Sequence, residues 1–239
     1  MKTTSNSVAF ILGFFIFIGL TALGFQLAKA AIEFKQLERS VTVKGLAEKE
    51  VAADVVIWPI QFISADNDLQ ALYKSIDENT NKIKAFLNDN GIASSDITVS
   101  PPSIIDKSAQ QWSSGDGAEF RYSATQTVTV YSEHVAQVRS VMSELSALGK
   151  QGIVLMSDSY EAQTEYIYTQ LNDIKPEMIE EATRNAREAA TKFAEDSDSV
   201  LGKIRRASQG QFSINARDKN NPHIMKVRVV STVEYYLSD

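Results

Sequence analysis

The sequence predicts an α+β fold, in which a largely antiparallel sheet packs with three helices behind an N-terminal transmembrane helix. A single uncharged apolar run occupies residues 8–28. Beyond residue 40 the apolar pattern alternates between a period of two and a period of 3.6, as strands and helices require. Segments with strand periodicity outnumber the helical ones and often follow one another directly. Such an order favours an antiparallel sheet over a doubly wound one.

The N-terminal run is long enough to cross a bilayer. Residues 8–28 read VAFILGFFIFIGLTALGFQLA, and a helix of that length spans roughly 31 Å, about the thickness of the hydrocarbon layer. A cleaved signal peptide is the alternative, because Lys2 is a basic start and Ala28-Lys29-Ala30 fits a small-x-small cleavage pattern. The length of the run and the helical character of the stretch after it favour an uncleaved anchor.

These features divide the chain into four regions. We expect a short tail at residues 1–7, a transmembrane anchor (or signal peptide) at 8–31, a helical linker at 32–39 and one domain at 40–239. The anchor would contact the lipid bilayer through residues 8–28.

The domain is expected to contain seven strand regions and three helices. The strand regions lie at residues 41–43, 51–63, 97–105, 120–131, 153–167, 203–214 and 224–237. The helices lie at 69–90 and 135–149, and a third begins at Pro176, where a missing N–H costs nothing. The third helix should bury one apolar face: Met178, Ala182, Ala186, Ala189, Ala190 and Phe193.

Three local signals refine these expectations. Residues 44–48, which contain Gly45, predict a turn between the first two strands. Pro59 predicts a sheet edge or a bulge, since proline cannot donate to a ladder. An Asp at residues 66–68 caps the first helix and Gly91 ends it.

Charge and cysteine content exclude several functions. Residues 32–239 hold 22 basic and 30 acidic residues, and an acidic surface repels phosphate backbones, so nucleic-acid binding is not expected. The chain has no cysteine, which excludes disulfides, thiolate metal sites and a cysteine nucleophile.

The sequence predicts no catalytic residues, metal site or cofactor. No nucleophile elbow or phosphate-binding loop occurs. The two histidines, His134 and His223, could share a site only if the fold brings them together, and we expect two exposed, solvated side chains. Trp112 lies in the polar loop 106–117 without an obvious packing partner. It is therefore the candidate binding residue, for a second subunit, a ligand or lipid headgroups.

Three segments in this order resemble the SIMPL domain, a bacterial envelope family without an assigned activity. The first is Val41-Thr42-Val43-Lys44-Gly45-Leu46-Ala47-Glu48 with the strand at 54–57. The second is the alanine-spaced helix 181–194, which runs on to Val200-Leu201-Gly202-Lys203-Ile204, and the third is the strand 227–235. The family often has a second glycine one turn before Gly202, where this chain has Ser197 or nearby polar residues.

The resemblance implies a body exposed to the periplasm and anchored in the bacterial inner membrane by a single pass. It also implies ring-like homo-oligomers and a link to envelope or oxidative-stress defence. The positive-inside rule conflicts with this orientation, since Lys29, Lys35 and Arg39 follow the apolar run 8–28, and Lys2 and the amino terminus precede it. We follow the resemblance and expect a non-enzymatic, self-assembling envelope protein. The alternative is a monomeric periplasmic binding module for an envelope ligand, whose identity the sequence does not give, or for a partner protein.

Overall fold

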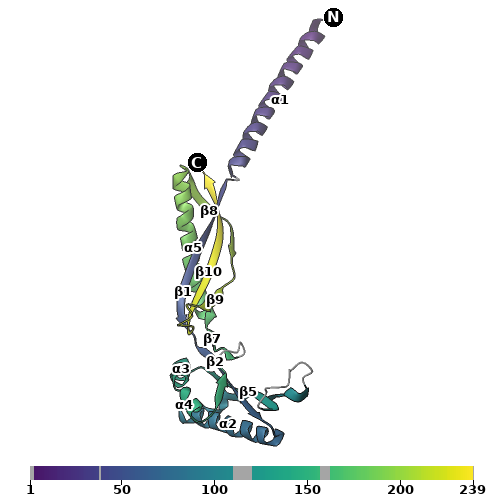
Figure 1. The fold of residues 1–239 in the computed structure, drawn as a ribbon. Helices are drawn as coiled ribbons and strands as arrows, with labels where there is room; N and C mark the ends of the chain where they lie inside the picture. The colour runs from purple at the N-terminus through teal and green to yellow at the C-terminus, as the bar shows by residue number, and fades with distance from the viewer. Residues whose placement is uncertain (1–2, 38, 110–119, 157–161, 239) are drawn as a thin grey trace. The chain divides into compact units, whose positions relative to one another are not determined.

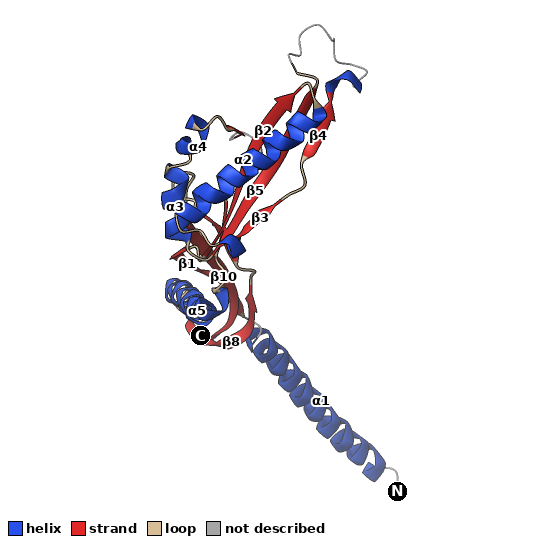
Figure 2. Ribbon diagram, turned by 90° about the horizontal axis from the view of Figure 1, so that it is seen from below, coloured by secondary structure: helices blue, strands red, loops and turns tan. Residues whose placement is uncertain are grey.

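The computed structural model describes residues 3–37, 39–109, 120–156 and 162–238 (Figure 1). The chain forms two compact units. Unit 1 comprises residues 1–48, 175–213 and 228–239, and unit 2 comprises 49–174 and 214–227. Helices, antiparallel sheets and an apolar N-terminal helix confirm the predicted α+β class, and the strands form two sheets (Figure 2).

The N-terminal helix α1 (Thr3–Leu37) contains the predicted apolar run. Its segment Val8–Ala31 has a mean hydropathy of 2.5, and none of it is buried in protein. A helix of this length and composition can cross a membrane, because it pairs every backbone polar group internally. A signal sequence has the same properties, so both interpretations of the N-terminus fit.

Unit 1 is built on a sheet with the strand order β1-β10-β8. These strands are β1 (Ser40–Ala52), β10 (Ile224–Ser238) and β8 (Val200–Gln209), and the short β9 (Ser213–Ala216) also pairs with β10. Helix α5 (Leu171–Asp196) covers one face with its buried alanines. The resulting core is small: Val43, Ala186, Ala190, Val233 and Tyr235.

Unit 2 contains a six-stranded sheet covered on one face by three helices. The strands are β2 (Val55–Asp66), β3 (Ile97–Val99), β4 (Ser103–Asp106), β5 (Tyr122–Ser132), β6 (Val154–Met156) and β7 (Glu165–Ile167). The helices are α2 (Leu69–Asp89), α3 (Val135–Ser143) and α4 (Ser146–Lys150), with 3₁₀ turns at Ser94–Asp96 and Lys107–Ala109. Long β2 and β5 pair in the centre, from Val56↔Ser132 to Asp66↔Tyr122.

The core of unit 2 holds large side chains from both layers. Phe62, Leu72, Ile83, Leu87 and Val130 are each at most 1% exposed. Asp68 caps α2 by accepting a hydrogen bond from the N–H of Ala71 at 2.8 Å, and Gly91 follows the helix with φ of 83°. Both helix ends were predicted, and each satisfies backbone groups that an exposed helix end leaves unpaired.

The predicted turn at residues 44–48 is wrong, because β1 is one continuous strand from Ser40 to Ala52. A Cβ on Gly45 would overlap the carbonyl oxygen of Ala182 and the backbone nitrogen of Ala186 in α5. The glycine therefore permits close helix-to-sheet packing in the middle of a strand. The strand ends at Ala52, and the next strand, which begins at Val55, belongs to the other sheet.

Pro59 lies in a central strand rather than at an edge, which corrects the prediction for this residue. Its strand β2 pairs with β5 along its whole length, and Pro59 is opposite Thr129. On the other side of β2, β7 pairs with Val55–Ile57 and β6 pairs with Gln61–Ile63. Pro59 occupies the interval between these two short strands, where no ladder hydrogen bond requires its N–H.

The predicted helices differ from the structure in three details. The expected helix at 135–149 is split into α3 and α4. The third helix begins at Leu171 rather than Pro176, so the proline lies inside α5. Phe193 is 58% exposed instead of buried, because the buried stripe continues through Ala190 and Ala194.

Candidate functional site

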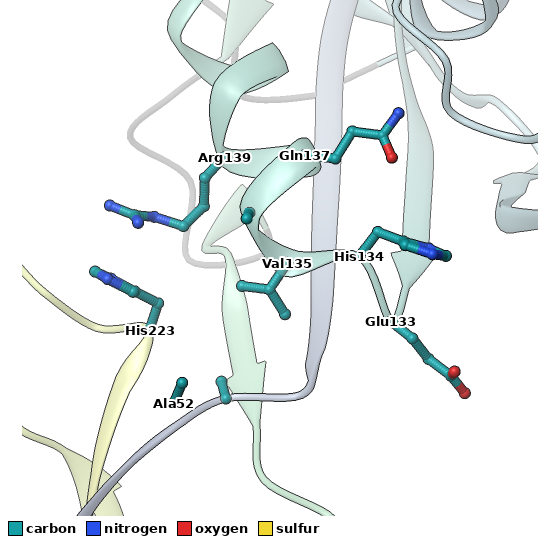
Figure 3. A pocket seen from close by; sticks show the side chains of 9 residues that line it. Ala52, Glu133, His134, Val135, Gln137, Arg139 and His223 are labelled. Carbon is teal, nitrogen blue, oxygen red and sulfur yellow. The ribbon is translucent and has the colours of Figure 1, made fainter.

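Unit 2 contains an open cavity of about 480 Å³ at the start of α3 (Figure 3). All of its lining residues belong to this unit. They come from the end of β1, the first turns of α3 and the segment before β10. The lining residues are Ala52, Ala53, Glu133, His134, Val135, Ala136, Gln137, Arg139 and His223.

Arg139 is the cation of this cavity. Among the described residues no carboxylate lies within ion-pair distance of its guanidinium. Arg139 interacts with the phenol of Tyr166, whose pKa is raised by burial and lowered in part by Arg139. A phenol does not neutralise a guanidinium, so Arg139 keeps its charge for another partner.

The side chain of His223 has a buried ring nitrogen. Its Nδ1 has no hydrogen-bond partner among the described residues. The ring lies edge-on to Tyr166, with 6.2 Å between centroids, and the backbone carbonyl accepts the N–H of Ala53 at 2.8 Å. Burial, with the nearby positive charges of Arg139 and Arg217, lowers the pKa of His223 from 6.5, while Asp218 raises it. Neutral imidazole is therefore favoured at pH 7.

The segment carrying His223 is held by Asp218. One carboxylate oxygen of Asp218 accepts the N–H groups of Asn220 and Asn221 at 2.9 and 2.8 Å, and the other accepts from Arg217 Nε at 2.9 Å. Bonding with Arg217 contributes most to lowering the pKa of Asp218 to about 2. The carboxylate stays ionised at neutral pH and fixes the turn that leads to His223.

The first turn of α3 borders the same cavity. His134 occupies the N-cap position, but its side chain forms no capping hydrogen bond. Val135, Ala136 and Gln137, which follow it, all line the cavity. N–H groups at the start of a helix have no intrahelical acceptor and carry partial positive charge, so they favour an anion nearby.

A second feature of functional interest is the edge strand β8 of the unit 1 sheet, whose outer side pairs with no other described strand. In the order β1-β10-β8, β8 is hydrogen-bonded on one side, through β10. Nine of its ten residues are exposed. Apolar side chains are among them, with Val200 at 62% and Ile204 at 49% exposure. Their neighbours Lys203, Arg205 and Arg206 make the strand basic.

The candidate residues named from the sequence have different outcomes. Trp112 lies outside the described residues, so its binding role stays a prediction. His134 is exposed as expected, whereas His223 is only partly exposed and its Nδ1 is buried. Both histidines line one cavity, although Figure 3 shows the His134 side chain pointing away from His223. Within the described ranges, no group of three or more His, Asp or Glu residues is placed to hold a metal ion.

Sequence reasoning missed Arg139 as a site residue. On the sequence it is one polar residue on the outer face of a short helix, as solvated arginines commonly are. Only the fold places it beside His223, which is 84 positions further along the chain.

A comparison with known families matches residues 41–234 to SIMPL, described as a protein of unknown function (DUF541). The match covers all of unit 2 and most of unit 1 beyond its N-terminal helix. A comparison with curated proteins finds no match. Since the family match covers most of the chain, this protein belongs to the SIMPL family.

Proposed function

We propose that this chain is a non-enzymatic, membrane-anchored envelope protein that assembles with copies of itself. The apolar helix α1 supports anchoring in the bacterial inner membrane. A body on the periplasmic side and a role in envelope or oxidative-stress defence belong to the same proposal, as the family resemblance implies. The observation that carries self-assembly is the edge strand β8, whose outer side has no partner strand within the described ranges.

An unpaired edge of this length readily accepts another strand. Proteins that stay monomeric usually shorten, bulge or cover such edges. Here ten residues lie at the edge, and the apolar Val200 and Ile204 are exposed on it. The basic side chains Lys203, Arg205 and Arg206 make the edge selective, because a partner strand must tolerate or complement positive charge.

The other terminal strand of this sheet, β1, is the matching surface on a second copy. It carries Glu48 and Glu50 near its end, which pair within the chain with Arg228 at 3.6 Å and Arg217 at 3.4 Å. Addition of a second copy would exchange these pairs for contacts with the basic side chains of β8. Pairing of β8 with β1 joins two different surfaces, and such contacts produce rings when the rotation between copies closes. The proposal therefore predicts a closed oligomer rather than a dimer with two identical contacts.

The experiment that tests the proposal removes one hydrogen-bond donor from the outer edge of β8. Gly210 donates its N–H to the carbonyl of Val230 at 2.8 Å, and the register pairs Ala207 with Val233. Because N–H directions alternate along a strand, the N–H of Ala207 points away from β10. Ala207→Pro should thus spare the sheet of one copy and block the addition of a second.

The expected result is a defined oligomer for the detergent-solubilised full-length protein and a loss of that oligomer in Ala207→Pro, as measured by light scattering. Ala207→Ser is the matched control and should retain the oligomer. A monodisperse monomer of the unaltered protein at high concentration would refute self-assembly. An oligomer that persists in a folded Ala207→Pro variant would refute the β8 edge as its interface.

Orientation is tested with a single introduced cysteine, since the chain has none of its own. Asn220 is exposed and uses only its backbone N–H, which bonds to Asp218. In Asn220→Cys, a membrane-impermeant maleimide should label the protein in intact spheroplasts. Labelling only after lysis would place the body in the cytoplasm and favour the charge rule over the family resemblance.

The cavity of unit 2 favours the second candidate function, a monomeric binding module. Binding to the native state alone raises the stability of a protein, so a ligand would be detected by a higher melting temperature. The measurement of oligomer mass distinguishes the two functions, because a binding module needs no contact between copies.

A further inference from the structure

The cavity at the start of α3 combines positive charge with apolar walls. Arg139 is its charged donor, and no described carboxylate pairs with it. Glu133 is the single acid among the lining residues, and Figure 3 shows its side chain directed away from Arg139. Ala52, Ala53 and Val135 present methyl groups to the same space. A cationic ligand would meet repulsion here, and a purely apolar ligand would leave the guanidinium unused.

His223 supplies a second polar group with an unmet requirement. A buried nitrogen without a partner is rare in native proteins and indicates a missing partner atom. In the view of Figure 3, His223 and Arg139 lie on the same side of the cavity. A neutral imidazole can donate a hydrogen bond from Nδ1 to one oxygen of a bound ligand group. A second oxygen of the same group would then face the guanidinium of Arg139.

We propose that this cavity binds a small organic carboxylate with a short apolar chain, held by Arg139 and His223. Arginine presents its donors as a planar fork that matches a carboxylate. The apolar chain would lie against Ala52, Ala53 and Val135, and the uncapped first turn of α3 adds favourable partial charge. This site is distinct from the β8 edge, so it does not depend on self-assembly.

The charges around His223 agree with an anionic ligand. Arg139 and Arg217 both oppose its protonation, and Asp218 alone among the neighbouring charges favours it. Tyr166, packed against the ring, is kept neutral by burial. A bound carboxylate would offset the two arginines and raise the pKa of His223. Binding should therefore strengthen as the pH falls toward the pKa of this imidazole.

Histidine NMR provides a direct test, because the chain has two histidines and both line the cavity. The full-length protein in detergent is labelled with ¹³C at histidine Cε1 and titrated with sodium butyrate at pH 7. His134→Gln assigns the remaining signal to His223. We expect a saturable shift of the His223 signal that neither sodium chloride nor the neutral butyramide produces.

Arg139→Gln should weaken butyrate binding by about ten-fold or more, the effect of losing a charge-assisted hydrogen bond. Arg184→Gln is the matched control, since Arg184 is exposed on α5 and distant in sequence from the cavity. It should leave the affinity unchanged. Equal loss in both variants would indicate a general charge effect and would overturn the proposal.

Two other outcomes would also overturn the assignment. A shift that grows linearly with butyrate, or that butyramide reproduces, would mean that no carboxylate site exists. If inorganic phosphate binds saturably and butyrate does not bind, the ligand of this cavity is a different anion and not a carboxylate. None of these outcomes bears on oligomer mass, so failure of this proposal is distinguishable from failure of self-assembly.

Discussion

The two units place different amounts of side-chain volume between helix and sheet. In unit 2, aromatic and branched side chains such as Phe62, Leu72 and Ile83 fill the space between β2, β5 and α2. In unit 1, alanines of α5 lie directly on β1 and β10, and Gly45 removes even a methyl group from the contact. Unit 2 therefore gains its stability from buried volume, and unit 1 from close backbone approach.

This difference determines which substitutions each unit tolerates. A thick core loses stability when side chains are made smaller, because a cavity remains. A closely packed helix–sheet interface loses stability when side chains are made larger, because the backbone atoms cannot move apart to make room. Unit 1 also leaves the long strand β8 open, which fits a unit completed by contact with a second copy.

The largest effect is expected from Phe62→Ala in unit 2. Phe62 is 1% exposed, and truncation of a buried phenylalanine costs about 3–5 kcal/mol. Chemical denaturation followed by circular dichroism measures the change. Phe193→Ala is the matched control, since that side chain is 58% exposed on α5. Equal losses in the two variants would contradict the assignment of the main core to unit 2.

Next in size is the effect of Gly45→Ala in unit 1. The new methyl group would meet backbone atoms of Ala182 and Ala186, and overpacking of this kind costs about 1–3 kcal/mol or more. The same substitution at Gly149 in α4 has open space within 4 Å. Gly149→Ala should be neutral or raise stability by about 0.5–1 kcal/mol through helix propensity. A stable Gly45→Ala variant would contradict the close-packed interface.

A smaller loss is expected from Asp68→Ala at the start of α2. This change removes the bond of 2.8 Å to the N–H of Ala71 and should lower the free energy of unfolding by about 1 kcal/mol. Asp77→Ala, at an exposed position within the same helix, is the control and should have little effect. If both changes lower the melting temperature equally, the loss arises from charge rather than from the cap.

The smallest effect concerns pH. The pKa of His223 in the folded protein lies below 6.5, so the unfolded chain takes up the proton first as the pH falls. The free energy of unfolding should be at its full value above the pKa of the unfolded chain. It should decrease as the pH falls from that pKa to the lower pKa of His223 in the folded protein. NMR titration should show the His223 signal of Arg139→Gln changing at a higher pH than that of the unaltered protein, because one repelling charge is gone. An unchanged midpoint would place Arg139 too far away to act on the imidazole.

Local signals in the sequence correctly predicted the features that depend on neighbouring residues alone. Asp68 and Gly91 mark the ends of α2 because capping and positive φ involve neighbouring residues only. The turn predicted from Gly45 is wrong, since a glycine required by a distant helix has the same sequence signal as a glycine in a turn.

The candidate sites depended on contacts that the sequence does not encode locally. His223 and Arg139 face one cavity because the segment before β10 returns beside α3. The open edge of β8 follows from the strand order, in which the C-terminal β10 occupies the centre of the unit 1 sheet. Neither fact can be obtained from periodicity, which predicts that a strand exists but not which strand lies beside it.

By itself, the sequence determined the apolar N-terminal helix, the α+β class and the SIMPL resemblance. These follow from composition, from the spacing of apolar residues and from local backbone chemistry, all of which act over a few turns or strand positions. The tertiary structure alone decided the division into two sheets, the role of Gly45, the central place of β2 despite Pro59, and the joining of two histidines in one cavity. Those outcomes depend on which segments pack together, and packing joins residues far apart in the chain.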